Sequence, residues 1–209
     1  MESKNHKIIK NFLSREDQSK IIDWVSSMKQ EIVPDNHHLR YLISKINGDS
    51  YMFDISKTQE TKEISNYQSG GHVMIEEVPQ IIHDIIDKIC ETTDIPKKNC
   101  FLQAVDMDHG GVIGKHYDAS KDGYINHKCN ISVLAEDYEF FIEDEKFIIE
   151  EGDLYCFNAS LYKHWTQKPF TARRILLSFG FMLEYEDLGL DWENPRVRMS
   201  RRICSKFQK

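Results

Sequence analysis

The sequence predicts a mainly β protein of the α+β class, an antiparallel jelly roll with N-terminal helices packed on one of its sheets. Two amphipathic helical patterns lie within the first hundred residues, and short β-like runs separated by turns follow from residue 100. No internal repeat and no Pro/Gly/Ser-rich linker divides the chain. We therefore expect a single domain over residues 1–209, with helical support and a substrate flap in 1–99, the β core in 100–183 and a basic tail in 184–209.

Composition and cysteine usage are those of an ordinary globular chain. Of the 209 residues, 40% are apolar and 29% are charged, and no apolar run approaches the roughly 18 residues of a membrane span. The N-terminus does not resemble a signal peptide. The five cysteines are odd in number and form no CxxC pair, which indicates reduced thiols rather than a disulfide framework or a zinc site. We expect a reducing, cytoplasmic location and no membrane partner.

The first helix is indicated by its cap and by its apolar spacing. A short strand over residues 8–13 leads into Ser14, which together with Asp17 resembles a capping box. The apolar residues that follow recur at helical spacing until Pro34, so one face of the helix is expected to pack. These residues are Ile21, Ile22, Val25, Met28 and Ile32.

Residues 35–76 are irregular, and we interpret them as two short strands and a flap that forms part of the substrate wall. The adjacent His37 and His38 lie in a polar loop and are interpreted as surface residues. The aromatic side chains of the flap could clamp a substrate or simply pack. They are Tyr41, Tyr51, Phe53 and Tyr67.

A second helix is expected after Pro79, a residue suited to a first helical turn, and it should end at residues 92–96. Its apolar stripe consists of Ile81, Ile82, Ile85, Ile86 and Ile89. Beyond it, strands are expected over residues 100–107, 112–117, 129–135, 138–143, 146–149, 153–158 and 174–183.

Three residues have the chemistry of a metal site. A strand over 112–118 would direct His116 and Asp118 to the same face, because strand side chains alternate with a period of two. His164, which follows the strand expected at 153–158, is the natural third ligand. Two imidazoles and one carboxylate that leave three positions open form the facial triad of non-haem Fe(II) oxygenases.

The last expected strand has two different faces. One face is wholly apolar and should pack against the helices, with Ile175, Leu177, Phe179 and Phe181. The other begins with Arg174 and includes Ser178. A guanidinium beside a hydroxyl is a suitable anchor for a carboxylate, because arginine binds it bidentately.

With these features the sequence resembles the Fe(II)/2-oxoglutarate-dependent dioxygenase superfamily, in particular its prolyl-hydroxylase-like and AlkB-like members. The shared pattern is the His-x-Asp pair, a second histidine about 46 residues later and an arginine nine or ten residues beyond it. The entry phrase at residues 11–14, the turn at Gly152-Asp153 and the closing strand at 174–179 are also similar. The resemblance implies a cupin-like double-stranded β-helix that spans nearly the whole chain.

The resemblance also implies residue roles. His116, Asp118 and His164 would be the catalytic Fe(II) ligands, and Arg174, with Arg173 as the reserve, would bind the distal carboxylate of 2-oxoglutarate. The implied reaction consumes 2-oxoglutarate and O2, releases succinate and CO2, and hydroxylates a C–H bond. Asp118 argues for hydroxylation, because related halogenases carry a small residue at its position.

The sequence departs from the family pattern at one cosubstrate position. Many members carry a tyrosine nine residues before the first ligand, where this chain has Met107. Tyr155 or Tyr124 could take its place in binding the cosubstrate. The two arginines 173 and 174 could alternatively form salt bridges with the acidic run 136–151.

The primary substrate stays open at the level of sequence. The favoured class is an amino-acid side chain in a protein, a peptide or a free amino acid, since the acidic body disfavours an extended phosphate-binding face. The alternative is AlkB-like oxidative demethylation of N-alkylated bases, although that family typically has a further arginine where this chain has Gly180. A small natural-product metabolite is a third class. The non-enzymatic alternative is a catalytically silent β-sandwich binding module.

The C-terminal segment carries a strong local charge. Residues 195–209 hold six basic side chains and no acid, so the other 194 residues have a net charge of −13. Such a tail could contact the phosphates of a nucleic acid, or it could lie in solvent or against the acidic body. We favour the second interpretation.

Overall fold

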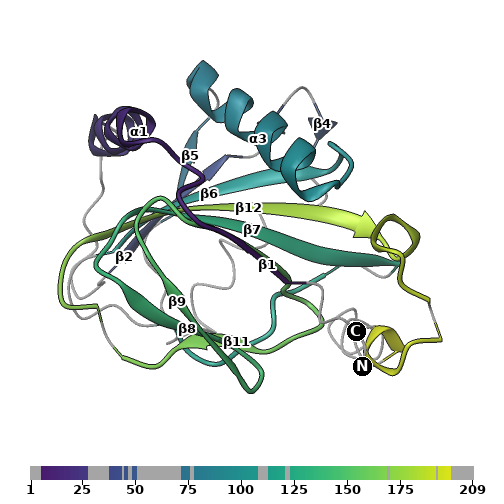
Figure 1. Ribbon diagram of the computed structural model, residues 1–209. Coiled ribbons are helices and arrows are strands. Elements are labelled where there is room, and N and C mark those ends of the chain that lie inside the picture. Colours follow the sequence, from purple (N-terminus) through teal and green to yellow (C-terminus); the bar gives the residue numbers. More distant parts are fainter. Residues whose placement is uncertain are drawn as a thin grey trace.

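The computed structural model describes residues 6–27, 38–43, 45–46, 49–50, 72–75, 78–107, 113–120, 123–168, 170–191 and 193–198. Its frame is a seven-stranded sheet in the order β1-β10-β7-β12-β6-β2-β5 and a three-stranded sheet in the order β11-β8-β9 (Figure 1). Neighbouring strands run antiparallel except for the parallel pair β2–β5. Two helices cover the large sheet, and the small sheet lies on its other side. The predicted jelly roll with helices on one sheet is confirmed.

The strands are β1 (Lys7–Ile9), β2 (His38–Ile43), β3 (Lys45–Ile46), β4 (Asp49–Ser50), β5 (His72–Ile75), β6 (Cys100–Met107), β7 (Tyr124–Leu134), β8 (Tyr138–Ile142), β9 (Glu145–Ile149), β10 (Leu154–Asn158), β11 (His164–Thr166) and β12 (Arg174–Glu184). The helices are α1 (Arg15–Ser27), α3 (Gln80–Thr93) and the 3-10 turn η2 (Glu186–Leu188).

Local features set the start of α1 and both ends of α3. The Ser14 hydroxyl oxygen accepts the backbone N–H of Asp17 at 3.1 Å, which satisfies one of the free donors at the start of α1. Pro79 lies one position before α3, and Asp94 closes that helix in the left-handed conformation at φ 58°. Neither of these helices, in the part of the chain that is described, is long and apolar enough to cross a membrane.

The large sheet separates two cores, as the alternation in the last strand predicted. On the helix side, Ile175, Leu177 and Phe179 of β12 join the buried isoleucines of α1 and α3 in one cluster. On the other side, Leu176 packs with Phe140 and Phe157, which come from β8 and β10. The second core therefore lies between the two sheets, on the face that carries Arg174 and Ser178.

One expectation about local structure needs correction. Residues 113–117 do not form the predicted strand; His116 alone makes an isolated bridge, to His164. Within the irregular segment at 35–76, where short strands were expected, β2 and β5 join the large sheet. Of the residues discussed for the flap, His37, Tyr51, Phe53 and Tyr67 lie outside the described part of the chain.

The turn at Gly152-Asp153 fastens the N-terminal strand to the sheet. The Asp153 carboxylate is fully buried and accepts hydrogen bonds from the Lys10 ammonium at 2.8 Å and from the backbone N–H groups of Asn11 and Glu150. Gly152 has a φ of +87°, and its carbonyl accepts the N–H of Leu13. This short turn therefore sets the position from which α1 starts.

Gly180 lies directly against the ring of Phe101. A Cβ atom at position 180 would stand 2.1 Å from Cε1 and from Cζ of that ring, well inside contact distance. Phe101 therefore fills the space into which a side chain at position 180 would extend. No side chain fits at position 180 unless this ring moves.

Because Gly180 has no free space, Gly180→Ala is expected to destabilise the protein by roughly 1–3 kcal/mol, the usual effect of overpacking a core. Urea unfolding followed by circular dichroism measures the difference. The double variant Gly180→Ala, Phe101→Leu should recover part of the lost stability, because the smaller side chain vacates the position. Equal stability of Gly180→Ala and the wild type would contradict the packing described here.

Candidate active site

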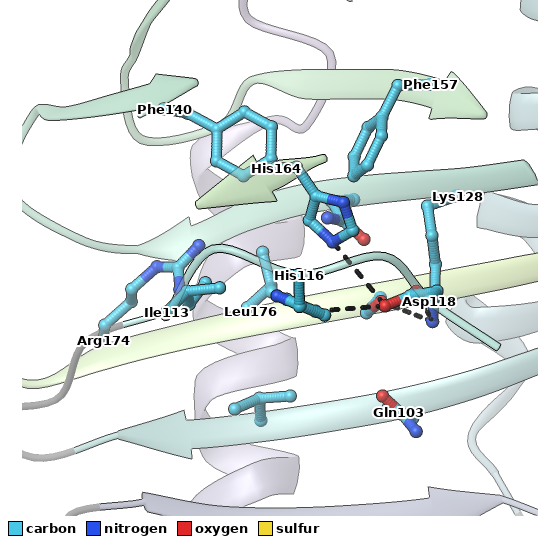
Figure 2. A pocket seen from close by; sticks show the side chains of 13 residues that line it. Gln103, Ile113, His116, Asp118, Lys128, Phe140, Phe157, His164, Arg174 and Leu176 are labelled. Atoms are coloured by element: carbon cyan, nitrogen blue, oxygen red, sulfur yellow. Dashed lines mark hydrogen bonds and ion pairs between the residues drawn. The ribbon is translucent and has the colours of Figure 1, made fainter. Parts of the chain in front are cut away.

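Three ligand-type side chains that are far apart in sequence meet in one pocket (Figure 2). His116 and Asp118 come from the segment 113–120, and His164 is the first residue of β11. Nε2 of His116 lies 3.1 Å, and Nε2 of His164 lies 3.6 Å, from Oδ1 of Asp118. The ligating atoms of the three residues all lie within 4.8 Å of one another. The structure thus brings together the three residues that the sequence predicts as metal ligands.

Main-chain hydrogen bonds orient both histidines. His116 and His164 exchange backbone N–H to carbonyl bonds of 3.3 and 3.0 Å, so the two ligand-bearing segments are paired directly. Nδ1 of His116 lies 2.6 Å from the carbonyl of Gly114, and Nδ1 of His164 lies 3.2 Å from the carbonyl of Tyr162. A carbonyl only accepts, so each Nδ1 carries a hydrogen. Each Nε2 faces the Asp118 carboxylate; it donates to this carboxylate in a protonated ring and offers a lone pair to a cation in a neutral ring.

This arrangement fits a divalent cation. Two neutral imidazole lone pairs and one carboxylate oxygen point at the same space, and an ion at that place satisfies all three. Backbone partners at the far ring nitrogens are what metal-ligating histidines usually have. Burial alone would raise the pKa of Asp118, but Lys128 and the hydrogen bonds with the two histidines hold it well below its usual range. The carboxylate is therefore ionised and ready to bind at neutral pH.

Lys128 is a site residue that the sequence analysis did not identify. This β7 side chain is 5% exposed, and its Nζ lies 3.6 Å from Oδ2 of Asp118 and 3.3 Å from the hydroxyl of Ser178. It also lies 4.4 Å from the centroid of the Phe101 ring. A lysine in a strand with alternating polar residues is ordinarily exposed. The sign that Lys128 faces the site is that the polar face of β7 continues the face of β12 that carries Arg174, which becomes visible once the two strands are paired.

Arg174 lies on the opposite side of the triad from Lys128 (Figure 2). It is 1% exposed, and its Nη2 donates to the Tyr138 hydroxyl at 2.7 Å and to the Tyr155 hydroxyl at 3.2 Å. The guanidinium also lies over the rings of Tyr138 and Phe170 at 4.5 and 4.6 Å. An arginine fixed in this way holds a rigid fork of donors at the end of the pocket.

The other residues predicted for cosubstrate binding divide into two groups. Ser178 lines the pocket, and Tyr155 supports Arg174 from behind without lining it. Burial raises the pKa of Tyr155 well above its ordinary value, so its hydroxyl stays protonated. Arg173 points elsewhere and makes a two-pronged pair with Asp106 at 2.9 and 2.7 Å. Tyr124 does not line the pocket.

The pocket joins the triad to Arg174 through apolar walls and has a volume of about 100 Å³. Val105, Ile113, Phe140 and Leu176 lie along it, while Gln103, Asn130 and Lys128 add polar groups. His164 is enclosed by aromatic rings, with the Phe157 ring at 4.8 Å between centroids. A metal-type donor set at one end and a buried guanidinium at the other suit a short dicarboxylate.

The fold is similar to several solved structures. It superposes on the viral collagen prolyl hydroxylase of Paramecium bursaria Chlorella virus-1 with a TM-score of 0.56 and 14% identity, covering 85% of this chain and 96% of that one. For a Pseudomonas putida prolyl-4-hydroxylase the TM-score is 0.52 and the identity 10%, with 86% of this chain and 93% of that chain covered. For HygX of Streptomyces hygroscopicus with nickel, 2-oxoglutarate and hygromycin B bound, the TM-score is 0.55 and the identity 9%, with 85% of this chain and 82% of that chain covered.

These likenesses are structural. No protein-family model matches the sequence, and no curated protein matches it either. The chain has the fold that these proteins share.

Proposed function

We propose that this chain, which has the fold of the 2-oxoglutarate–Fe(II) oxygenases, is an enzyme of that type that hydroxylates a C–H bond of an amino-acid side chain in a protein, a peptide or a free amino acid. The observation that carries the proposal is the meeting of His116, Asp118 and His164 in the pocket that ends at Arg174. A catalytically silent module has no need to bury a guanidinium beside such a donor set. The overall reaction turns 2-oxoglutarate, O2 and R–H into succinate, CO2 and R–OH.

In this proposal His116, Asp118 and His164 would hold Fe(II), which supplies the redox chemistry that activates O2 when it is bound. Arg174 would bind the distal carboxylate of 2-oxoglutarate, and Tyr138 and Tyr155 keep the guanidinium in place. Val105, Ile113, Phe140 and Leu176 line part of the space between the two ends with apolar groups. The chain itself therefore contributes positioning of the reactants.

The structure favours amino-acid side chains over alkylated bases as substrates in two ways. The further arginine typical of AlkB-like proteins has no space at position 180, because Phe101 fills it. The described part of the basic tail is paired within the chain, since Arg196 bonds Glu143 at 3.1 Å and Arg198 pairs with Glu193. The tail residues beyond 198 lie outside the described part. Two of the structural relatives are prolyl hydroxylases, which is consistent with this substrate class.

The test is a screen for succinate release with and without ferrous ion across amino acids, peptides and methylated oligonucleotides. We expect iron-dependent release that an amino acid or a peptide stimulates most strongly. Stimulation by the oligonucleotides alone, sensitive to salt and lost when residues 195–209 are removed, would instead favour demethylation of bases. No release under any condition would support the binding-module alternative.

Lys128 gives this proposal a prediction of its own. Its ammonium lies on the Oδ2 side of Asp118, so Oδ1 would be the oxygen that binds the ion. Without the lysine the carboxylate can turn and present both oxygens, so Lys128→Met should lower kcat by about 10-fold or more. Ferrous-ion affinity should not weaken, because a positive charge near the ion has also been removed. Iron binding and turnover are measured separately.

The matched control for this prediction is Lys146→Met. Lys146 is exposed and pairs with Glu139 on the surface of the small sheet, so its replacement should leave ferrous-ion binding and kcat unchanged. Lys128→Arg, which keeps the charge, should recover part of the turnover. A Lys128→Met enzyme with wild-type kcat would contradict the positioning role.

A further inference from the structure

A second group of metal-ligating side chains lies on the opposite face of the large sheet from the active site. His127 and Cys129 of β7 and Cys156 of β10 are each at most 5% exposed, and their ligating atoms all lie within 4.8 Å of one another. The two cysteines belong to the core beneath the helices. Lys128, the residue between His127 and Cys129, points the other way into the active site.

Strand pairing explains why these residues meet. Cys129 and Cys156 are direct cross-strand partners in the antiparallel pair β7–β10, and His127 and Asn158 are partners two positions along. Residues two apart in a strand share a face, so all four side chains gather on one side. Both strands lie inside the large sheet, with β1 beyond β10 and β12 beyond β7. The group is therefore held on a rigid part of the frame.

The imidazole of this group has a fixed orientation. Nδ1 of His127 lies 2.7 Å from Oδ1 of Asn158, which is 1% exposed. An amide oxygen only accepts, so Nδ1 carries the hydrogen and Nε2 keeps its lone pair. A polar partner at the far nitrogen is what metal-ligating histidines usually have. Buried thiols alone would be inert small hydrophobes, whereas an oriented imidazole among them adds a donor.

We propose that His127, Cys129 and Cys156 form a zinc site that is separate from the active site. Zinc binds thiolates and imidazole with tetrahedral geometry, and three protein donors supply three of its four positions. The active-site group contains no sulfur, so the two sites suit different ions. Binding replaces the thiol protons, so up to two protons are released for each ion bound.

The thiolate is the form of cysteine that binds metal, and both thiols of this group are buried in the core. The five cysteines were interpreted from their spacing as unconnected reduced thiols; the cross-strand register brings two of them together with a histidine.

Cobalt titration of the purified protein tests the proposal. Cobalt bound by thiolates gives an intense near-ultraviolet charge-transfer absorption, which the sulfur-free triad cannot produce. We expect this band in the wild type and in Asp118→Ala; in Asp118→Ala, whose triad has lost its carboxylate, the band should saturate at one equivalent, and zinc should displace cobalt in both proteins. Cys129→Ser and Cys156→Ser should each weaken the band and bind zinc at least about 100-fold more weakly, and the double serine variant should lose the band. Cys90→Ser, which replaces a half-buried thiol of α3, should keep the charge-transfer band and the zinc affinity of the wild type.

Thermal unfolding gives a second readout that needs no active enzyme. Zinc should raise the Tm of the wild type and of Asp118→Ala, but not that of the double serine variant, because only a site present in the folded state stabilises it. Absence of the charge-transfer band in freshly reduced wild-type protein would overturn the proposal. So would zinc affinity that is the same in the wild type and the double serine variant, or a Cys129–Cys156 disulfide in protein isolated under reducing conditions.

Discussion

Replacement of Asp118 by alanine is expected to lower ferrous-ion-dependent succinate release by more than about 100-fold, because loss of an outer partner of a ligand already costs 10- to 100-fold in metal affinity or activity. The residue supplies the carboxylate between the two Nε2 atoms, at 3.1 and 3.6 Å. Without it, two neutral imidazoles remain beside the Lys128 ammonium, which repels a cation. Iron binding and succinate release should therefore fall together.

The control for this variant is Asp144→Ala. Asp144 is an exposed carboxylate in the turn between β8 and β9, so its loss should change neither iron binding nor turnover. A thermal unfolding curve separates loss of the site from loss of the fold. An Asp118→Ala protein that binds iron and turns over like the wild type would contradict the proposed centre.

Replacement of Arg174 by methionine is expected to raise the KM for 2-oxoglutarate by about 100-fold or more. Hydrogen bonds between charged groups contribute about 1.5–3 kcal/mol, and each 1.4 kcal/mol is a factor of ten. The guanidinium is 1% exposed and held by two tyrosine hydroxyls, so little reorganisation offsets the gain on binding. Steady-state kinetics with 2-oxoglutarate as the varied reactant measures this effect.

The neighbouring arginine provides the matched comparison. Arg173→Lys keeps a cation beside Asp106, outside the pocket, and should leave the KM for 2-oxoglutarate within about twofold. The KM of Arg174→Lys should lie between those of the wild type and Arg174→Met, because lysine retains the positive charge but lacks the two parallel N–H donors of the guanidinium. If Arg173→Lys raised this KM as much as Arg174→Met, the assignment of the anchor would be wrong.

Residue patterns were sufficient to predict the fold where apolar residues recur with the spacing of a helix or with the alternation of a strand. The isoleucine spacing of α3 gave a helix with a buried stripe, and the alternation of β12 separated Ile175 and Leu177 from Arg174. The meeting of His116, Asp118 and His164 was also anticipated from their order and chemistry. Their function as iron ligands, and that of Arg174 as cosubstrate anchor, remain predictions.

The features that the sequence did not predict lie where two strands must be paired before the surroundings of a side chain are known. Lys128 looks like a surface residue until β7 is placed beside β12. Cys129 and Cys156 look unrelated until the register of β7 and β10 is known. The segment before Asp118 was expected to be a strand, yet one bridge at His116 is enough to place the ligands. Short-range patterns contain no information on such pairings.

The backbone bridge between His116 and His164 has a consequence for competition among metals in a cell. Paired main chains hold the two ligand-bearing segments at a set separation, which limits how far the site adjusts to the size or preferred geometry of an incoming ion. Discrimination then depends on intrinsic affinities, which place nickel, copper and zinc above ferrous iron, and on the free concentration of each. In the proposed centre these ions should displace iron, so turnover in vivo should follow the ratio of available iron to its competitors.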